Sequence, residues 1–408
     1  MKILFTGGGT GGHLFPNLAI IDELIKETKG QVEILYLGSS DGLEAKIIPA
    51  QGINFQAIAV GKWRRYLSFK NLTDGLKILK GIWQSIKIIR KFKPQVVFSK
   101  GGFVSLPVAV AAWLQKVPVI THESDVTSGM ANRIIFKLAQ VICISWTATQ
   151  KTLLLTTRAQ GKPLKKQVVH TGIPVRRGLN QGSQKAGYTL TGFDSNLPVL
   201  LVIGGSQGAA YLNELIKNSI GKLVKFCQVV HVMGKQVANS KEQIAKSKWQ
   251  RTNGKEQMVN SKFKILDSKF FRNYKQFEFL NERELADIFA ITTLVVSRAG
   301  ATALAEFAYV GLPVLLIPLD LDQSRGDQIE NAEILAQSSV AVMSREQELN
   351  PENFARTVQE LLRSPVQLLK FKKNLQNFFP PDADKKIVEL ILEAGRVRIS
   401  KQETLNHD

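Results

Sequence analysis

A buried strand, a glycine-rich loop and a helix follow one another twice in this sequence, and this order most constrains the fold. The first copy joins Ile3–Phe5 through the loop Thr6–Gly12 to a helix with apolar residues at helical spacing. The second joins Val199–Ile203 through Gly204–Gly208 to another such helix. Because parallel strands need crossover helices between them, the two copies predict two parallel sheets.

Further apolar runs of strand character alternate with helical stretches in both halves of the chain. They are Val32–Leu37, Val96–Phe98, Val117–Thr121 and Val141–Ser145 in the first half, and Val229–Met233, Phe277–Leu280, Leu294–Ser297 and Val314–Ile317 in the second. Uninterrupted apolar runs are typical of strands that helices cover on both faces. The predicted class is therefore α/β, with two Rossmann-like domains.

A chain of 408 residues is expected to divide its core between two domains. We expect an N-terminal domain over residues 1–180 and a C-terminal domain over 197–380, joined by the Gly-, Ser-, Thr- and Asn-rich stretch 181–196 as a linker. Residues 381–408 should form a terminal helix, ending near Ala394, and a frayed tail. The polar stretch 235–276 indicates a surface excursion around short elements.

The charge of the chain suggests an anionic partner, since 54 Lys and Arg stand against 34 Asp and Glu, a formal charge of +20. Residues 1–180 hold 25 of the basic and 9 of the acidic residues. Within them, residues 62–100 mix 11 basic side chains and one acidic residue, Asp74, with large apolar groups. Only two cysteines, no apolar run of membrane-spanning length and no signal-peptide pattern lead us to expect a reducing, cytoplasmic setting.

The loop Gly7–Gly12, followed by His13, is the strongest local signal for chemistry. Glycines let backbone N–H groups approach phosphate oxygens, and the next helix offers its positive end to an anion. The loop also fits the weak G-x-G-x-x-G fingerprint of dinucleotide binding, but His13 and Leu14 stand where a Walker A loop requires Lys and Ser or Thr. A P-loop nucleoside triphosphatase is therefore excluded. His13 is either a structural histidine or a general base.

Three further polar segments follow predicted strands, at the edge where open α/β sheets bind ligands. His122–Asp125 could line a ligand site or cap a helix, and it lacks the spacing of a metal site. Ser297–Glu306 enters a helix rich in small residues, where Glu306 suits a ribose diol, although small residues also serve close packing. Asp320–Gln328 could line a sugar pocket or form a solvated loop.

Taken in order, these segments resemble the motifs of the MurG family, the N-acetylglucosaminyltransferases of bacterial peptidoglycan synthesis. The segments that carry the resemblance are Gly7–His13, Gly101–Ser105, His122–Glu123, Gly172–Arg176, Gly204–Gly208, Ser297–Glu306 and Asp327–Ala332. The resemblance implies a glycosyltransferase B fold, that is, two Rossmann-like domains facing a cleft. It also implies an inverting transfer of N-acetylglucosamine from UDP-N-acetylglucosamine to the muramoyl 4-hydroxyl of lipid I, which gives lipid II.

The resemblance implies roles for individual residues and no metal or cofactor. His13 matches the family's proposed general base, and Thr10, Gly11 and Gly12 match a loop at the donor sugar and acceptor diphosphate. The other positions that match substrate contacts are Arg176 as a donor-side cation, Ser206 at the pyrophosphate, Leu280 at uracil, Glu306 at the ribose and Gln328 at the donor sugar, together with Gln207, Gly208, Ala301, Thr302 and Asp327. Asp125 departs from the amide that is often found in the family, which puts a donor contact there in question.

The resemblance finally implies partners and a location. We expect peripheral association with anionic lipid at the cytoplasmic face of the bacterial cell membrane, with Trp83 and Trp113 as anchors unless both pack inside the domain. Other cell-wall synthesis proteins are candidate partners, and a nucleic-acid partner is not expected because no nucleic-acid-binding signature is visible. The alternatives are a related UDP-sugar glycosyltransferase with a different lipid acceptor and a nicotinamide-dependent oxidoreductase.

Overall fold

The computed structural model describes residues 1–61, 69–159, 166–205, 209–234, 249–252, 255–258, 272–321 and 326–405. The chain divides into two compact units. Unit 1 comprises Met1–Arg176 together with Phe379–Asp408, and unit 2 comprises Arg177–Phe378. The C-terminal helix, expected as a segment of its own, thus belongs to unit 1.

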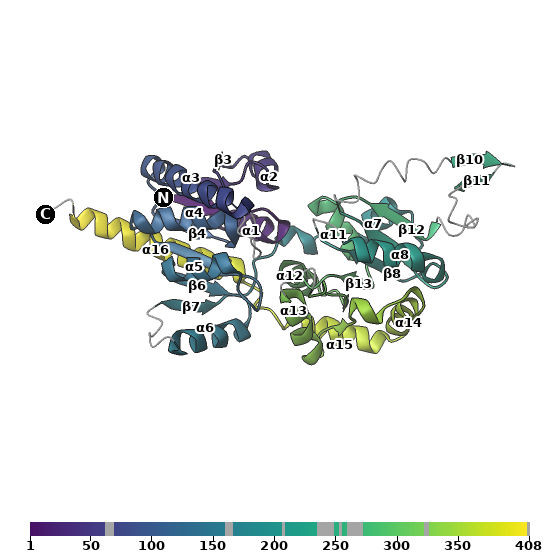
Figure 1. The fold of residues 1–408 in the computed structure, drawn as a ribbon. Coiled ribbons are helices and arrows are strands. Elements are labelled where there is room, and N and C mark those ends of the chain that lie inside the picture. The colour runs from purple at the N-terminus through teal and green to yellow at the C-terminus, as the bar shows by residue number, and fades with distance from the viewer. Residues whose placement is uncertain are drawn as a thin grey trace. The chain divides into compact units, whose positions relative to one another are not determined.

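Unit 1 is built on a seven-stranded parallel sheet in the order β3-β2-β1-β4-β5-β6-β7 (Figure 1). Its strands are β1 (Lys2–Thr6), β2 (Glu33–Gly38), β3 (Asn54–Ala57), β4 (Val96–Ser99), β5 (Val119–Glu123), β6 (Val141–Ile144) and β7 (Gln167–His170). The chain winds outward from β1 in one direction and from β4 in the other. The pair β1–β4, in which Thr6 lies beside Ser99, is therefore the switch point beside which open α/β sheets bind ligands.

Helices cover both faces of this sheet, in two apolar clusters. One cluster joins α1 (Gly11–Glu27) and α2 (Glu44–Ala50) to the C-terminal helix α16 (Ala383–Leu405), through residues such as Leu18 and Ile387. The other joins α3 (Phe69–Phe92), α4 (Gly102–Leu114) and α5 (Met130–Leu138), and α6 (Thr147–Ala159) follows β6. α16 continues to Leu405, so the tail expected beyond Ala394 is helical up to that residue.

Unit 2 contains a six-stranded parallel sheet in the order β12-β9-β8-β13-β14-β15 (Figure 1). Its strands are β8 (Val199–Ile203), β9 (Gln228–Val232), β12 (Tyr274–Phe277), β13 (Leu294–Ser297), β14 (Val314–Leu316) and β15 (Val342–Met343). A separate antiparallel pair is formed by β10 (Trp249–Thr252) and β11 (Lys255–Met258). The helices are η1 (Arg177–Asn180), α7 (Gln184–Thr191), α8 (Ala210–Leu223), α11 (Glu282–Ile291), α12 (Ala301–Val310), α13 (Asp327–Gln337), η3 (Glu346–Glu348), α14 (Pro351–Leu362) and α15 (Pro365–Gln376).

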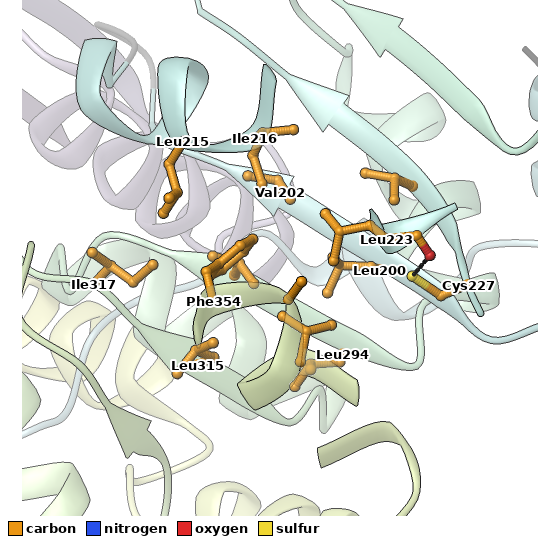
Figure 2. Packing of buried hydrophobic residues seen from close by; sticks show 14 of the residues in the cluster. Leu200, Val202, Leu215, Ile216, Leu223, Cys227, Leu294, Leu315, Ile317 and Phe354 are labelled. Atoms are coloured by element: carbon orange, nitrogen blue, oxygen red, sulfur yellow. Dashed lines mark hydrogen bonds between the residues drawn. The ribbon is translucent and has the colours of Figure 1, made fainter. Parts of the chain in front are cut away.

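The core of unit 2 is assembled from segments far apart in the sequence (Figure 2). Leu200, Leu294 and Leu315 of three neighbouring strands pack with α8 and with Phe354 of α14. The Cys227 thiol donates a hydrogen bond to a helix carbonyl 3.3 Å away, and burial raises its pKa to about 12. Both cysteines are free and buried, as expected of a chain without a disulfide framework.

The apolar runs identified the central strands of both sheets, and the differences lie at the edges. β3 and β7 were not expected because they are short and carry polar residues at a sheet edge. The run Phe277–Leu280 was expected as a strand, but β12 ends at Phe277 because the chain turns there toward the Asn281 cap of α11. The expected linker 181–196 contains helix α7, which packs on α11 within unit 2.

Candidate functional site

The glycine loop between β1 and α1 is held by a fully buried carboxylate, Glu44. One carboxylate oxygen accepts the backbone N–H of Gly9 at 3.0 Å, and the other accepts the backbone N–H and the hydroxyl of Ser39, both at 3.0 Å. A Cβ at Gly8 would lie 2.2 Å from the carboxylate carbon, so this position requires glycine. Glu44 therefore fixes the shape of the loop that precedes His13.

His13 lies in the first turn of α1, with its ring held on two sides. The Thr10 hydroxyl is 3.1 Å from its Nδ1. On the other side, a Cβ at Gly102 would lie 3.3 Å from its Nε2, so only a residue without a side chain allows this approach. Gly102 also has φ +78, which glycine adopts without strain. When Nδ1 donates its proton to Thr10, Nε2 keeps the lone pair that a general base needs.

The turn that carries Gly102 is connected to the end of β5 through Asn132 of α5. The Asn132 side-chain oxygen accepts the Gly102 N–H at 2.9 Å, and its side-chain N–H group donates to Glu123 at 2.8 Å. The other Glu123 oxygen accepts the backbone N–H of Asp125 at 3.1 Å. Burial raises the pKa of Glu123, and these hydrogen bonds act in the opposite direction.

His122, the residue before Glu123, is a fully buried histidine in β5. Its Nε2 lies 2.7 Å from the Gly172 carbonyl oxygen, to which it donates when the ring is neutral. Burial, with the neighbouring Lys100 ammonium, lowers the pKa of His122 well below its ordinary value. The sequence allowed either a ligand site or a structural role for this segment. His122 is therefore a neutral structural histidine, whose hydrogen bond joins β5 to Gly172 in the loop after β7.

Arg176 ends unit 1, and its guanidinium carbon lies 4.2 Å from the centre of the Phe15 ring in α1. A guanidinium that stacks on an aromatic ring keeps its positive charge. Its place beside α1 puts a permanent cation near the helix that carries His13.

In unit 2, the equivalent switch point lies between β8 and β13, beside the start of α12. Ala301 and Thr302 form its first turn, and Glu306 lies further along the same helix with an exposed fraction of 7%. The loop before α12 is fastened by Arg298, which donates to the Ile317 and Pro318 carbonyl oxygens and pairs with Glu346. This fastening presents the helix N-terminus and its N–H groups at the sheet edge.

The remaining unit 2 positions fall at two other loops. Asp327 and Gln328 begin α13, and the Gln328 side-chain oxygen accepts the Leu319 N–H at 3.0 Å. Leu280 is buried just before the Asn281 cap of α11. The positions Ser206, Gln207 and Gly208 lie outside the described residues.

The described part of the chain offers neither a metal-binding cluster nor a membrane-spanning helix. No group of three or more His, Cys, Asp or Glu side chains there is arranged to hold a metal ion. Among the same residues, no helix has the length and apolar character needed to cross a membrane.

Three residues of the unit 1 site were not singled out from the sequence: Glu44, Lys100 and Asn132. Each lies on a different element and acts on a loop that is distant in the sequence. The available signal was local and weak, namely a polar residue directly after a buried strand or in the first turns of a short helix. Lys100, which follows β4, has such a position.

Comparisons with known proteins agree with the two-domain α/β fold. The descriptions "Glycosyltransferase family 28 N-terminal domain" and "Glycosyltransferase family 28 C-terminal domain" match residues 3–144 and 199–387. The class that fold and site define is therefore a glycosyltransferase with two Rossmann-like domains, which confirms the predicted α/β class and an enzymatic function.

Curated relatives are similar over nearly the whole chain. A Bacillus cereus protein named UDP-N-acetylglucosamine--N-acetylmuramyl-(pentapeptide) pyrophosphoryl-undecaprenol N-acetylglucosamine transferase 2 is 38% identical over 96% of this chain and 99% of its own. A transferase of the same name, without the number, from Legionella pneumophila (strain Paris) is 39% identical over 97% of this chain and 98% of its own. The chain belongs to the MurG family, as its motifs predicted. The nicotinamide-dependent alternative is not favoured.

Solved structures share the fold at low sequence identity. MurG of Acinetobacter baumannii matches with a TM-score of 0.66 at 21% identity, covering 96% of this chain and 99% of that one. A UDP-GlcNAc 2-epimerase from Neisseria meningitidis, bound to UDP-GlcNAc, matches with a TM-score of 0.64 at 17% identity, covering 96% of this chain and all of that one. The fold alone therefore does not distinguish transferase from epimerase.

Proposed function

We propose that this protein transfers N-acetylglucosamine from UDP-N-acetylglucosamine to the 4-hydroxyl of the muramoyl sugar of lipid I and so produces lipid II. The observation that carries the proposal is the near-complete match to relatives named for this transfer, 38% identical over 96% of the chain. The geometry of the His13 ring, between Thr10 and Gly102, supports it.

The reaction is a single displacement with inversion. The acceptor 4-hydroxyl oxygen forms a bond to the anomeric carbon on the face opposite UDP, and the bond from that carbon to the diphosphate oxygen breaks. The hydroxyl proton passes to Nε2 of His13, and UDP leaves with the bonding electron pair. Backbone N–H groups at glycine loops and at the start of α12 suit the charge that develops on the diphosphate.

Unit 2 would supply donor recognition. Glu306 suits the ribose diol as a double acceptor, and Thr302 and the N–H groups of the first turn of α12 suit phosphate oxygens. Leu280, Asp327 and Gln328 would contact uracil and the donor sugar. Arg176 would add a cation for the diphosphate, and Ser206, Gln207 and Gly208 complete the set by family correspondence.

The outer surface of unit 1 supports peripheral binding to an anionic membrane at its cytoplasmic face. An exposed apolar set on α3 and α4 consists of Leu76, Leu79, Trp83, Trp113 and Leu114. We call it the α3–α4 apolar surface.

Trp83 and Trp113 are 57% and 53% exposed, so neither packs inside the domain. The Lys87 ammonium lies 3.4 Å from the centre of the Trp83 ring, which joins basic and apolar groups on one face. The basic residues expected at 62–68 lie outside the described part of the chain.

The test is transfer of labelled N-acetylglucosamine from its UDP ester to a short-chain lipid I analogue by the full-length protein. We expect His13→Gln to lose at least about 100-fold in kcat, as removal of a general base does. His170→Gln is the matched control, because His170 is a hydrogen-bonded histidine on the edge strand β7. Transfer to a diacylglycerol but not to lipid I would instead favour another lipid acceptor.

A further inference from the structure

We propose that Lys100 is a positioning residue of the transfer reaction, whose buried ammonium group neutralises Glu123 and thereby holds the Gly101–Gly102 turn against the His13 ring. This inference rests on the proposed function, because it assigns Lys100 a task only if His13 takes part in the reaction.

Lys100 is an unusual lysine because its side chain is 1% exposed. It follows β4 at the switch point, where its backbone N–H donates to the Thr6 carbonyl oxygen at 2.9 Å. Its ammonium group donates to the Ser124 hydroxyl at 2.5 Å. A buried ammonium group is costly unless a negative charge lies near it. The structure therefore has to provide a negative charge close to Lys100.

Glu123 provides this charge. It is 4% exposed, and the Lys100 ammonium donates to Ser124, the next residue along the chain. Burial, the largest effect, raises the pKa of the Glu123 carboxyl group, while the hydrogen bonds that it accepts and the Lys100 ammonium lower it. The other groups that act on Lys100 are the carboxylate of Asp125 and the thiol of Cys143 on β6, and His122 is acted on by Lys100 in turn. Without Lys100, Glu123 would be a buried carboxylate without a cation and would take up a proton more readily.

The charge of Glu123 determines which way the Asn132 amide points. An ionised carboxylate only accepts hydrogen bonds, so it requires the N–H end of the amide, at 2.8 Å. The oxygen end is then left for the Gly102 N–H, at 2.9 Å. A protonated Glu123 could donate to the amide oxygen instead, which would withdraw the acceptor from Gly102.

The consequence reaches the reacting histidine because Gly102 borders the His13 ring on the Nε2 side. A turn that has lost its acceptor would no longer fix this ring. The ammonium of Lys100 thus acts on His13 through Glu123, Asn132 and Gly102, and it need not touch substrate.

The variants that test this are Lys100→Met, which keeps length and removes charge, and Lys100→Arg, which keeps charge. Lys166→Met is the matched control, because Lys166 is a partly buried lysine that donates to the Phe136 carbonyl at 2.6 Å elsewhere in unit 1. We expect Lys100→Met to lower kcat roughly tenfold or more with KM for the donor within about twofold. The acidic limb of the pH profile of kcat for Lys100→Met should move to higher pH. Lys100→Arg should recover part of the lost kcat and bring the acidic limb back toward its wild-type position.

A second readout does not need activity. Amide hydrogen exchange at Gly102 should be faster in Lys100→Met than in the wild type and in Lys166→Met. If the wild-type protein transferred nothing to lipid I, the proposed function would be wrong, but the hydrogen-exchange test of the Lys100 contact would still apply. Unchanged exchange and an unchanged pH profile in Lys100→Met would overturn the inference, as would equal losses in the Met and Arg variants with no shift of the acidic limb.

Discussion

The hydroxyl of Thr10 lies 3.1 Å from Nδ1 of His13, across the first turn of α1. Thr10 is the N-cap residue of this helix, yet its side chain makes no capping hydrogen bond to the helix backbone. The Thr10 hydroxyl thus contacts the imidazole instead of the helix backbone, and it helps to hold the orientation of the ring.

We therefore expect Thr10→Val to lower kcat about tenfold, because the isosteric side chain removes the hydroxyl that contacts Nδ1 and helps to orient the ring. Steady-state transfer kinetics would measure this loss. Thr28→Val is the control, since the Thr28 hydroxyl donates to the Leu24 carbonyl at the other end of α1. Equal kcat in Thr10→Val and the wild type would show that the Thr10 contact is not needed.

Gly8→Ala should destabilise unit 1 by about 1–3 kcal/mol, because its Cβ would overlap the buried carboxylate of Glu44. Urea unfolding would show the loss as a lower midpoint. The matched variant is Gly75→Ala in α3, where no heavy atom lies within 4 Å of the added Cβ. That variant should gain stability by roughly 0.5–1 kcal/mol, since Ala favours helix. If Gly8→Ala left the stability unchanged, the buried Glu44 carboxylate would not restrict this position.

The stability of the protein should depend on pH through Lys100. Burial lowers the pKa of Lys100 from 10.5 to about 8 in the folded state. Between these two values the unfolded chain binds more protons than the folded chain, so the free energy of unfolding rises with pH. Relative to Lys100→Met, the wild type should gain on the order of 2–3 kcal/mol from pH 8 to 10.5. If the difference in unfolding free energy between the two proteins stayed constant across this window, the pKa of Lys100 would not be lowered in the folded state.

Membrane binding should depend on the α3–α4 apolar surface. The double variant Leu79→Ser with Trp83→Ser should lower partitioning to anionic vesicles by roughly tenfold, because two interfacial anchors are lost. Flotation with vesicles of graded anionic lipid content would measure it. Val366→Ser, at an 83% exposed apolar residue of unit 2, is the control. If vesicle partitioning changed neither with the anionic lipid content nor with the two substitutions, the α3–α4 apolar surface would not be the membrane contact.

Much of the fold could be predicted because its signals are local. β1, β8 and β13 each contain an uninterrupted apolar run, and a loop with at least one glycine follows each strand, so their strand character can be predicted without knowledge of their neighbours. The edge strand β3 was not predicted, because an edge strand has only one neighbour and tolerates polar residues. Helix α7 was not predicted, because its Gly and Thr residues have low helix propensity and obscure the helical spacing of its apolar residues.

The sequence by itself determined the two α/β halves, the family and the place of His13 after a glycine loop, since each depends on residues within a few positions of one another. Only the tertiary structure decided that Lys100 reaches Ser124, that Asn132 joins Glu123 to Gly102, and that Glu44 clamps Gly9. These partners are distant in the chain and belong to different elements. They meet because β1, β4 and β5 are neighbours in the sheet, and strand order is set by packing of the whole unit and not by local sequence.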